Sequence, residues 1–305
     1  MQENNFNYHV YPEQTVRVIT TTDAKCEADD QYAIVHALLT PKFDNRGFVA
    51  VHFGDEISKT SMMDSCHEIE RIFDIMEKPQ ELIFQGAEHA LRDEFTPVPS
   101  EGAKLIIREA MSDEKTPLFV TCQGAITDLA SAYLMEPAIA GRLTAIWIGG
   151  GSYPNGGDEF NLGNDINAAN VVMKSTIPLW QVPRPTYMKM RVSLAELEYR
   201  VRPCGEIGRY LFDQLVENSD IPRVYNDEVR SGEVWFLGDS PVVGLMMWDH
   251  PECYTWVEAP EITAQMHYVQ THKNRPIRVY HDIDARYILE DFYAKLSLYE
   301  QSKKK

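Results

Sequence analysis

Short β-rich runs and amphipathic helical segments alternate along the first two thirds of the chain. Strands are predicted at residues 16–22, 48–53, 118–121, 144–148 and 179–182. Apolar side chains recur at helical spacing in residues 29–39, 57–76, 102–111, 126–135 and 166–173. Repeated strand–helix–strand units predict an α/β fold with a Rossmann-like core, a mostly parallel central sheet with helices on both faces. Ligands of such sheets bind beyond the carboxyl ends of the strands, so we expect the functional residues in the loops after strands.

The last third of the sequence has a different pattern. From Ser193 it is mostly helical, residues 262–270 and 277–281 resemble a late pair of strands, and a final helix is predicted at 284–300. No Pro-, Ser- or Gly-rich linker divides the 305 residues. We therefore predict a single domain over residues 1–305, with a mostly helical insertion or cap around residues 193–235.

The charge balance limits the classes of partner. The chain has 29 basic and 46 acidic side chains, a net charge of −17. A surface this negative repels phosphate backbones and anionic lipid, so we expect neither nucleic acid nor membrane as a partner. No apolar run approaches the roughly 18 residues of a membrane span. The five cysteines are an odd number without CxxC spacing, which predicts no disulfide framework and no zinc site, and favours the cytoplasm.

Four carboxylates lie together directly after the first predicted strand. Asp23, Glu27, Asp29 and Asp30 fall within eight residues. A single acid here would be explained as a helix cap. Four acids repel one another unless protons or a cation compensate, and oxygen ligands of this kind suit a hard ion such as Ca²⁺ or Mg²⁺. The loop is therefore a candidate metal site.

Three later segments add polar residues at comparable positions, each just after a predicted strand or before a predicted helix. They are Val120-Thr-Cys-Gln-Gly-Ala-Ile-Thr-Asp-Leu-Ala, the stretch from Ile148-Gly-Gly-Gly through Glu159-Phe-Asn to Asn164-Asp-Ile-Asn-Ala-Ala, and Leu237-Gly-Asp-Ser-Pro-Val-Val. Each segment alone is a weak signal, because a glycine-rich turn or an Asp-Ser-Pro usually only begins a helix. Their order predicts that they converge on one crevice with the acidic loop.

Together these segments resemble the inosine-uridine nucleoside hydrolases, from about Val16 to Met247. The acidic loop is similar to that family's Asp-x-Asp-Pro-Gly-x-Asp-Asp signature, with two extra residues in this chain. The later segments are similar to its Gly-x-Leu-Thr-Asn-Ile-Ala, Met-Gly-Gly with Ala-Glu-Phe-Asn, Asp-Pro-Glu-Ala-Ala and His-Asp-Pro motifs. Glu159-Phe160-Asn161 is the sharpest single match.

The resemblance implies a role for each matching residue. The implied ligands of Ca²⁺ are Asp23, Asp30, Asp239 and the backbone carbonyl of Thr127, and Asp23 would also be the catalytic base. The implied substrate-binding residues are Asp29 and Asn161 at the sugar diol, Glu159 and Asn155 at the 5′-hydroxyl, Asp55 and Trp235. Tyr225 and Phe236 are further candidates for stacking on the leaving base.

The chain also departs from the family pattern. Gly238 stands where the family has the histidine that helps the leaving base depart in some members, and Asp55 replaces an asparagine. The sequence therefore assigns no leaving-group acid. Lys25, Cys26 and Glu27 in the longer acidic loop have no role that their chemistry suggests.

The expected function is Ca²⁺-dependent hydrolysis of the N-glycosidic bond in a ribonucleoside or related N-ribosyl compound. The expected partner is a nucleoside-like small molecule, and the resemblance implies a homodimer or homotetramer. Two alternatives remain open: a non-catalytic nucleoside- or sugar-binding protein on the same fold, and a Mg²⁺-dependent phosphohydrolase. The second lacks the downstream lysine and basic pocket that a phosphate would require.

Overall fold

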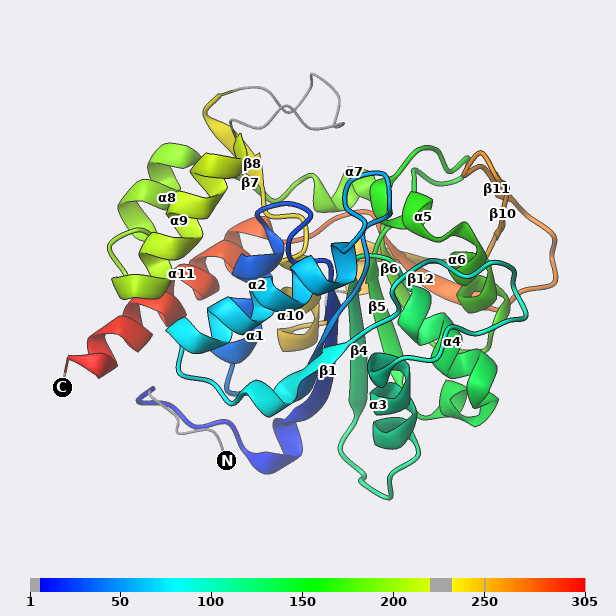
Figure 1. Cartoon of the computed structure of the whole chain (residues 1–305), viewed down its shortest axis with the longest axis horizontal. Coiled ribbons are helices and arrows are strands. Elements are labelled where there is room, and N and C mark those ends of the chain that lie inside the picture. The colour runs from blue at the N-terminus through cyan, green and yellow to red at the C-terminus, as the bar shows by residue number, and fades with distance from the viewer. Residues whose placement is uncertain (1–5, 220–231, 250, 305) are drawn as a thin grey trace.

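An eight-stranded sheet forms the centre of the molecule (Figure 1). The computed structural model describes residues 6–219, 232–249 and 251–304. The strand order is β3-β2-β1-β4-β5-β6-β12-β9. In that order the strands are Ile83–Gln85, Phe43–Ala50, Val16–Thr22, Leu118–Gln123, Thr144–Ile148, Leu179–Val182, Pro276–Tyr280 and Tyr254–Glu258. All neighbours pair in parallel except β12 and β9, so the predicted mostly parallel sheet is confirmed.

Helices cover both faces of this sheet (Figure 1). One face carries α1 (Asp30–Leu38), α2 (Ser61–Ile75), α10 (Pro241–Met247) and α11 (Ala285–Lys303). The other face carries α3 (Glu101–Ala110), α4 (Thr127–Met135) and α6 (Ile166–Lys174). Because side chains alternate along a strand, Val18 of β1 packs into the first core and Ile19 into the second. All seven residues of β1 are buried, as expected of a strand covered on both sides.

Shorter elements gather at one end of the sheet, the upper end in Figure 1. They include α5 (Phe160–Asn164), α7 (Arg184–Tyr187) and the two-stranded sheet of β7 (Arg191–Ser193) and β8 (Val234–Phe236). The helical region expected from Ser193 onward contains α8 (Leu194–Arg200) and α9 (Gly205–Ser219). The 3-10 turns in the described ranges are η1 (Pro12–Gln14), η2 (Gln80–Leu82), η3 (Pro137–Gly141) and η5 (Pro251–Cys253). None of the helices in the described ranges combines the length and apolar character needed to span a membrane.

The predicted late strand pair was right only for residues 277–281, which correspond to β12 (Pro276–Tyr280). Residues 262–270 reverse direction at Met266, which has a φ of 59° and whose amide donates to the Thr263 carbonyl over 2.9 Å. The segment therefore forms a small hairpin of β10 (Glu261–Ile262) and β11 (Tyr268–Val269). β12 pairs with β6 and with β9, an edge strand the sequence analysis did not identify. β2 begins at Phe43, earlier than the predicted start at residue 48. Its first half contains the polar run Asp44-Asn-Arg, which gave no strand signal in the sequence.

Candidate functional site

Three buried aspartates meet at the carboxyl edge of the sheet. Asp29 and Asp30 open α1 after the loop that follows β1, and Asp239 precedes α10, more than 200 residues later in the chain. One carboxylate oxygen from each lies within 4.8 Å of the other two. The three side chains are 8%, 2% and 4% exposed. The sheet thus brings acids from two distant loops into one buried group.

Helix capping does not account for this group. Asp29 is at the N-cap position of α1, yet its side chain makes no capping hydrogen bond. It accepts instead from the backbone amide of Gly238, in the loop that carries Asp239. Asp30 accepts a hydrogen bond from the Thr22 hydroxyl at the end of β1. Both contacts direct the carboxylates toward one another, whereas a cap would direct them along the helix.

The three carboxylates are buried close together, and within the described ranges none of them is paired with an opposite charge. Burial, together with the neighbouring carboxylates, raises the pKa values of Asp29 and Asp239 well above their ordinary range. Burial raises the pKa of Asp30 to about 7. Among the residues that the structure describes, no lysine or arginine forms an ion pair with any of the three. Buried carboxylates without a counter-charge are costly unless they are protonated or hold a metal ion.

Asp23 lies beside this group. It follows β1 directly, is 3% exposed, and its Oδ2 has no hydrogen-bond partner. Burial and the charges of Asp30, Glu27 and Asp29 raise its pKa. Its carboxyl packs against Gly124, where an added Cβ would lie 2.8 Å from Asp23 Cγ. An unsatisfied buried carboxylate oxygen next to three further carboxylates is a donor set that fits Ca²⁺.

Thr127 belongs to a separate buried network. It is the first residue of α4, and its hydroxyl donates to Asp165 Oδ2 over 2.7 Å. His52 Nε2 lies 2.9 Å from the same hydroxyl. Burial lowers the pKa of His52 to about 4, so the imidazole is neutral at pH 7 and donates to Thr127. Asp165 also accepts from the amides of Leu91 and Ala168, both over 2.8 Å, so it joins the segment after β3 to the starts of α4 and α6.

Glu159 and Asn161 lie in the loop after β5. The Glu159 carboxylate accepts hydrogen bonds from the backbone amides of Gly150, Asn161 and Leu162 and from the Tyr187 hydroxyl. Burial raises its pKa, and these four donors oppose that shift. Asn161 Nδ2 donates to the Ile148 carbonyl over 3.0 Å.

The other predicted substrate residues lie in more varied surroundings. The Asp55 side chain is 61% exposed and lies 3.8 Å from Lys59 Nζ, and Asn155 is exposed in the loop before Glu159. Trp235 on β8 is partly buried, and its Nε1 is buried without a hydrogen-bond partner. Phe236 follows it on the same strand. Tyr225 lies outside the described residues.

Two residues near the site had no signal in the sequence. Tyr187 on α7 lies beside both Gly238 and Glu159. Glu68 on α2 is 3% exposed and accepts from Lys25 Nζ over 2.9 Å, from Gln31 Nε2 over 3.4 Å and from the Tyr210 hydroxyl. Glu68 therefore anchors the longer acidic loop to α2 and α9. The helical spacing predicted for residues 57–76 gave no indication of this role.

The architecture and this acidic group define an α/β protein with a candidate metal site at the carboxyl edge of a mostly parallel sheet. Residues 8–290 match the family model described as inosine-uridine preferring nucleoside hydrolase. The chain therefore belongs to this family. None of the curated proteins compared with it matches significantly.

Solved structures of nucleoside hydrolases share the fold at low sequence identity. A purine-preferring ribonucleoside hydrolase from Gardnerella vaginalis is 17% identical, with a TM-score of 0.71 over 93% of this chain and 99% of that chain. The plant nucleoside hydrolase PpNRh1 is 17% identical, with a TM-score of 0.70 over 92% and 99%. An inosine-uridine preferring nucleoside hydrolase from Bacillus anthracis is 17% identical, with a TM-score of 0.66 over 93% and 100%. At this identity the likeness concerns the fold.

Proposed function

We propose that the protein hydrolyses the N-glycosidic bond of a ribonucleoside or a related N-ribosyl compound with the help of Ca²⁺. One observation carries this proposal: four buried carboxylates of like charge converge at the carboxyl edge of the sheet with no basic partner among the described residues. Membership of the nucleoside hydrolase family supports the substrate class.

Asp23, Asp30, Asp239 and the carbonyl of Thr127 are the proposed ligands of the ion, and Asp29 lies close enough to Asp30 and Asp239 to join them. Bound Ca²⁺ would supply the positive charge that polarises an attacking water and the sugar hydroxyls. The set consists of hard oxygen donors from loops and helix starts, which suits Ca²⁺ better than the smaller Mg²⁺.

Asp23 is the proposed general base, because its unpartnered Oδ2 can take the proton of the attacking water. Asp29 and Asn161 would hold the sugar diol, and Asn155 and Glu159 would lie toward its 5′-carbon. The aromatic ring of Trp235, and Asp55 at the rim, are proposed to contact the leaving base. The buried carboxylates would stabilise the positive charge that develops on the sugar as the bond breaks.

The leaving base receives no acid from Gly238, which carries no side chain. This departure is the observation that keeps a second candidate, a non-catalytic nucleoside- or sugar-binding protein on the same fold. The phosphohydrolase alternative is disfavoured, because the described part of the acidic group offers no cation to neutralise a phosphate. A substrate whose leaving group departs without protonation can be hydrolysed even if the protein has no leaving-group acid. Such a substrate therefore distinguishes an enzyme from a binding protein.

The test is hydrolysis of 4-nitrophenyl β-D-ribofuranoside by the purified protein, with Ca²⁺ and after treatment with a chelator. We expect release of nitrophenolate with Ca²⁺ and loss of activity without it. Glu290→Gln, at an exposed carboxylate paired with Arg200 on another part of the molecule, is the control variant and should keep full activity. Calorimetric binding of the probe without turnover would instead identify a binding protein.

A further inference from the structure

We infer that Tyr187 is a substrate-binding residue whose hydroxyl oxygen accepts the hydrogen bond of a substrate hydroxyl, that on the 5′-carbon of the sugar. The inference rests on the proposed function, which supplies the ribosyl substrate. It assigns the contact to a residue with no counterpart in the sequence motifs. It also gives Glu159 a different part: positioning Tyr187.

The first step is that Glu159 has no acceptor position left. A carboxylate offers about four lone-pair sites on its two oxygens. Oε2 accepts from the amides of Gly150 over 2.7 Å and Leu162 over 2.9 Å. Oε1 accepts from the amide of Asn161 over 3.2 Å and from the Tyr187 hydroxyl over 2.9 Å. Three of the four donors are backbone amides that cannot turn away, so an incoming hydroxyl meets the one side-chain donor, Tyr187.

The second step is the position of Tyr187 relative to the acidic group. A Cβ built on Gly238 would lie 3.0 Å from Tyr187 Cδ2 and 3.3 Å from Asp29 Oδ2. The tyrosine ring therefore fills the space beside Gly238 that a side chain there would need. Its hydroxyl end reaches Glu159, so one half-buried side chain joins the diol side of the site to the loop after β5. A sugar held by Asp29 would have its far end directed along this ring.

The third step is the hydrogen-bonding capacity of the phenol. Its single proton is donated to Glu159, which leaves the oxygen lone pairs to accept. Donation to a carboxylate also makes the oxygen a stronger acceptor, because hydrogen bonds in a chain polarise one another. Burial and the adjacent Glu159 charge raise the pKa of Tyr187, so the phenol stays protonated at physiological pH. The surrounding carboxylates favour a neutral hydroxyl and repel a 5′-phosphate.

The experiment compares 4-nitrophenyl β-D-ribofuranoside with its 5-deoxy analogue in the wild type and in Tyr187→Phe. A site built to bind a hydroxyl rejects the analogue that lacks it, so we expect wild-type kcat/KM to differ by about 100-fold or more. Tyr187→Phe should reduce that ratio by roughly tenfold or more, with the loss confined to the substrate that has the hydroxyl. The 5-deoxy analogue should react at nearly the wild-type rate.

Tyr299→Phe is the matched control. It removes another phenol that donates one hydrogen bond, to the Met76 carbonyl over 3.3 Å, on a helix away from the site. This variant should keep the full wild-type ratio. An equal loss on both substrates in Tyr187→Phe would overturn the inference, because it would show a structural role. An unchanged ratio would overturn it as well.

Calorimetric titration of both probes into the Ca²⁺-loaded protein distinguishes the two proposals. Binding that depends on the 5-hydroxyl, and loses this dependence in Tyr187→Phe, supports the assignment even if nothing is hydrolysed. In that case the proposed hydrolysis fails and the role of Tyr187 stands. If the wild type hydrolyses both probes without preferring the 5-hydroxyl, the proposed hydrolysis stands and the role of Tyr187 fails.

Discussion

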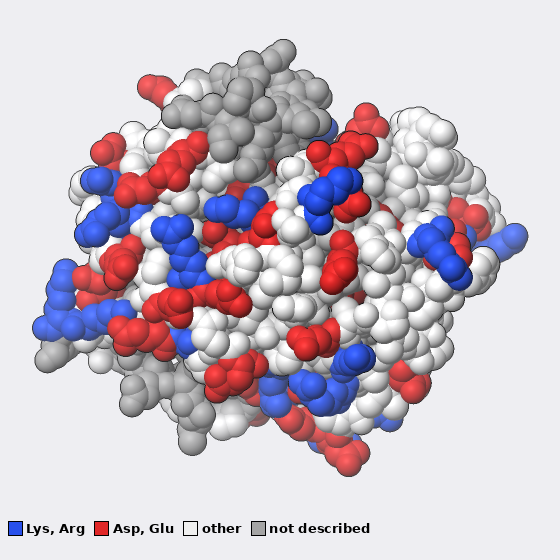
Figure 2. Space-filling model, viewed as in Figure 1, with Lys and Arg blue, Asp and Glu red and all other residues white. Residues whose placement is uncertain are grey.

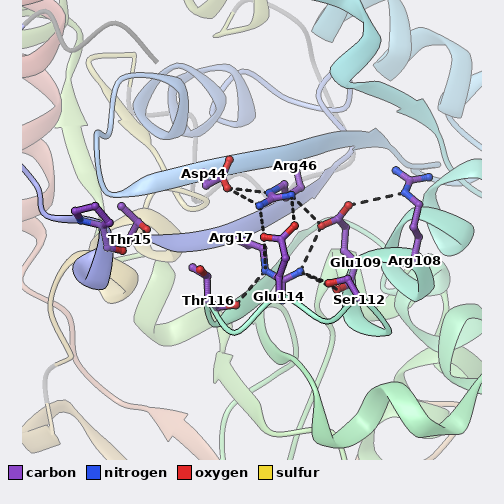
Figure 3. A network of polar contacts seen from close by, with 10 residues as sticks. Thr15, Arg17, Asp44, Arg46, Arg108, Glu109, Ser112, Glu114 and Thr116 are labelled. Atoms are coloured by element: carbon purple, nitrogen blue, oxygen red, sulfur yellow. Dashed lines mark hydrogen bonds and ion pairs between the residues drawn. The ribbon is translucent and has the colours of Figure 1, made fainter. Parts of the chain in front are cut away.

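The two ends of β1 both carry buried charged groups, but in opposite arrangements. At the amino end, Arg17 is 2% exposed and is held by several groups of the same chain (Figure 3). Its guanidinium donates to the carbonyls of Glu109 and Thr116 and to the Ser112 hydroxyl over 2.8–3.0 Å. Its Nη1 lies 3.5 Å from the Glu109 carboxylate and its Nε 3.9 Å from that of Glu114. The partners of this buried cation all lie within the chain.

At the carboxyl end, Asp23 and the three aspartates beside it share one sign of charge. On the surface, acidic and basic side chains are interspersed over the face in Figure 2, so exposed charges have opposite-sign neighbours. At the amino end, the chain itself supplies the partners of a buried charge, Arg17. An unpaired group of like charges at the other end of the same strand therefore indicates a site whose partner comes from outside the chain.

The largest expected effect concerns activity at the carboxyl end. Asp23→Asn removes the base and one metal ligand, and we expect kcat on the nitrophenyl riboside to fall by roughly 10³-fold or more, about 4 kcal/mol of transition-state stabilisation. The melting temperature should not fall, because the substitution removes a buried charge. A loss of activity below tenfold would show that Asp23 is not the base.

The next effect concerns stability at the amino end. Arg17→Met should lower the free energy of unfolding by about 3 kcal/mol, because it leaves the part-buried Thr116 carbonyl without a donor and removes hydrogen bonds to the Glu109 carbonyl and the Ser112 hydroxyl. The carboxylates of Glu109 and Glu114 keep Arg46 as a partner. Urea denaturation measures the change. The control is Arg108→Met, whose 60%-exposed guanidinium pairs with Glu109 over 3.8 Å and should change stability by about 0.5 kcal/mol or less. Similar losses in the two variants would contradict the difference in burial.

The third expectation is that Ca²⁺ and pH act together on stability. The pKa of Asp30 rises from 3.8 to about 7 on folding, so the folded state binds more protons than the unfolded state between these values. Stability of the metal-free protein should therefore be greatest in acid and decline as pH rises through about 7. Ca²⁺ at 100 times its Kd should restore about 2.7 kcal/mol at pH 8. At pH 5, where the aspartates are largely protonated, the thermal shift should be much smaller, and equal shifts at both pH values would refute the expectation.

The smallest expected effect is a gain in stability, whereas most substitutions of buried residues lower the free energy of unfolding. Asp239→Asn should stabilise the metal-free protein by about 1–2 kcal/mol at pH 8, because it removes one of several like charges while keeping a similar shape. It should also abolish the stabilisation by Ca²⁺. The same change at the other end of β1, Glu109→Gln, should destabilise, because Glu109 faces Arg17. Thermal melts of both variants with and without Ca²⁺ provide the comparison, and destabilisation by both would remove the distinction between the two ends.

Local sequence patterns determined most of the fold and part of the site. The run of apolar residues in β1 and the helical spacing after it predict a parallel sheet, because strand and helix periods are properties of neighbouring residues. The same reasoning placed the acids after strands, and Asp30 and Asp239 do meet at one edge. Short or polar strands such as β3, and the edge strand β9, gave no such periodic signal.

Only the tertiary structure decided how those residues are used. Asp29 joins Asp30 and Asp239 because a backbone amide from a loop more than 200 residues away orients it. Glu159 is fully hydrogen-bonded because the loop after β5 and α7 bring four donors to it, and Tyr187 borders the site because Gly238 leaves room for its ring. Such contacts join residues far apart in the chain and depend on how the elements pack. The spacing of residues along the sequence therefore does not predict them.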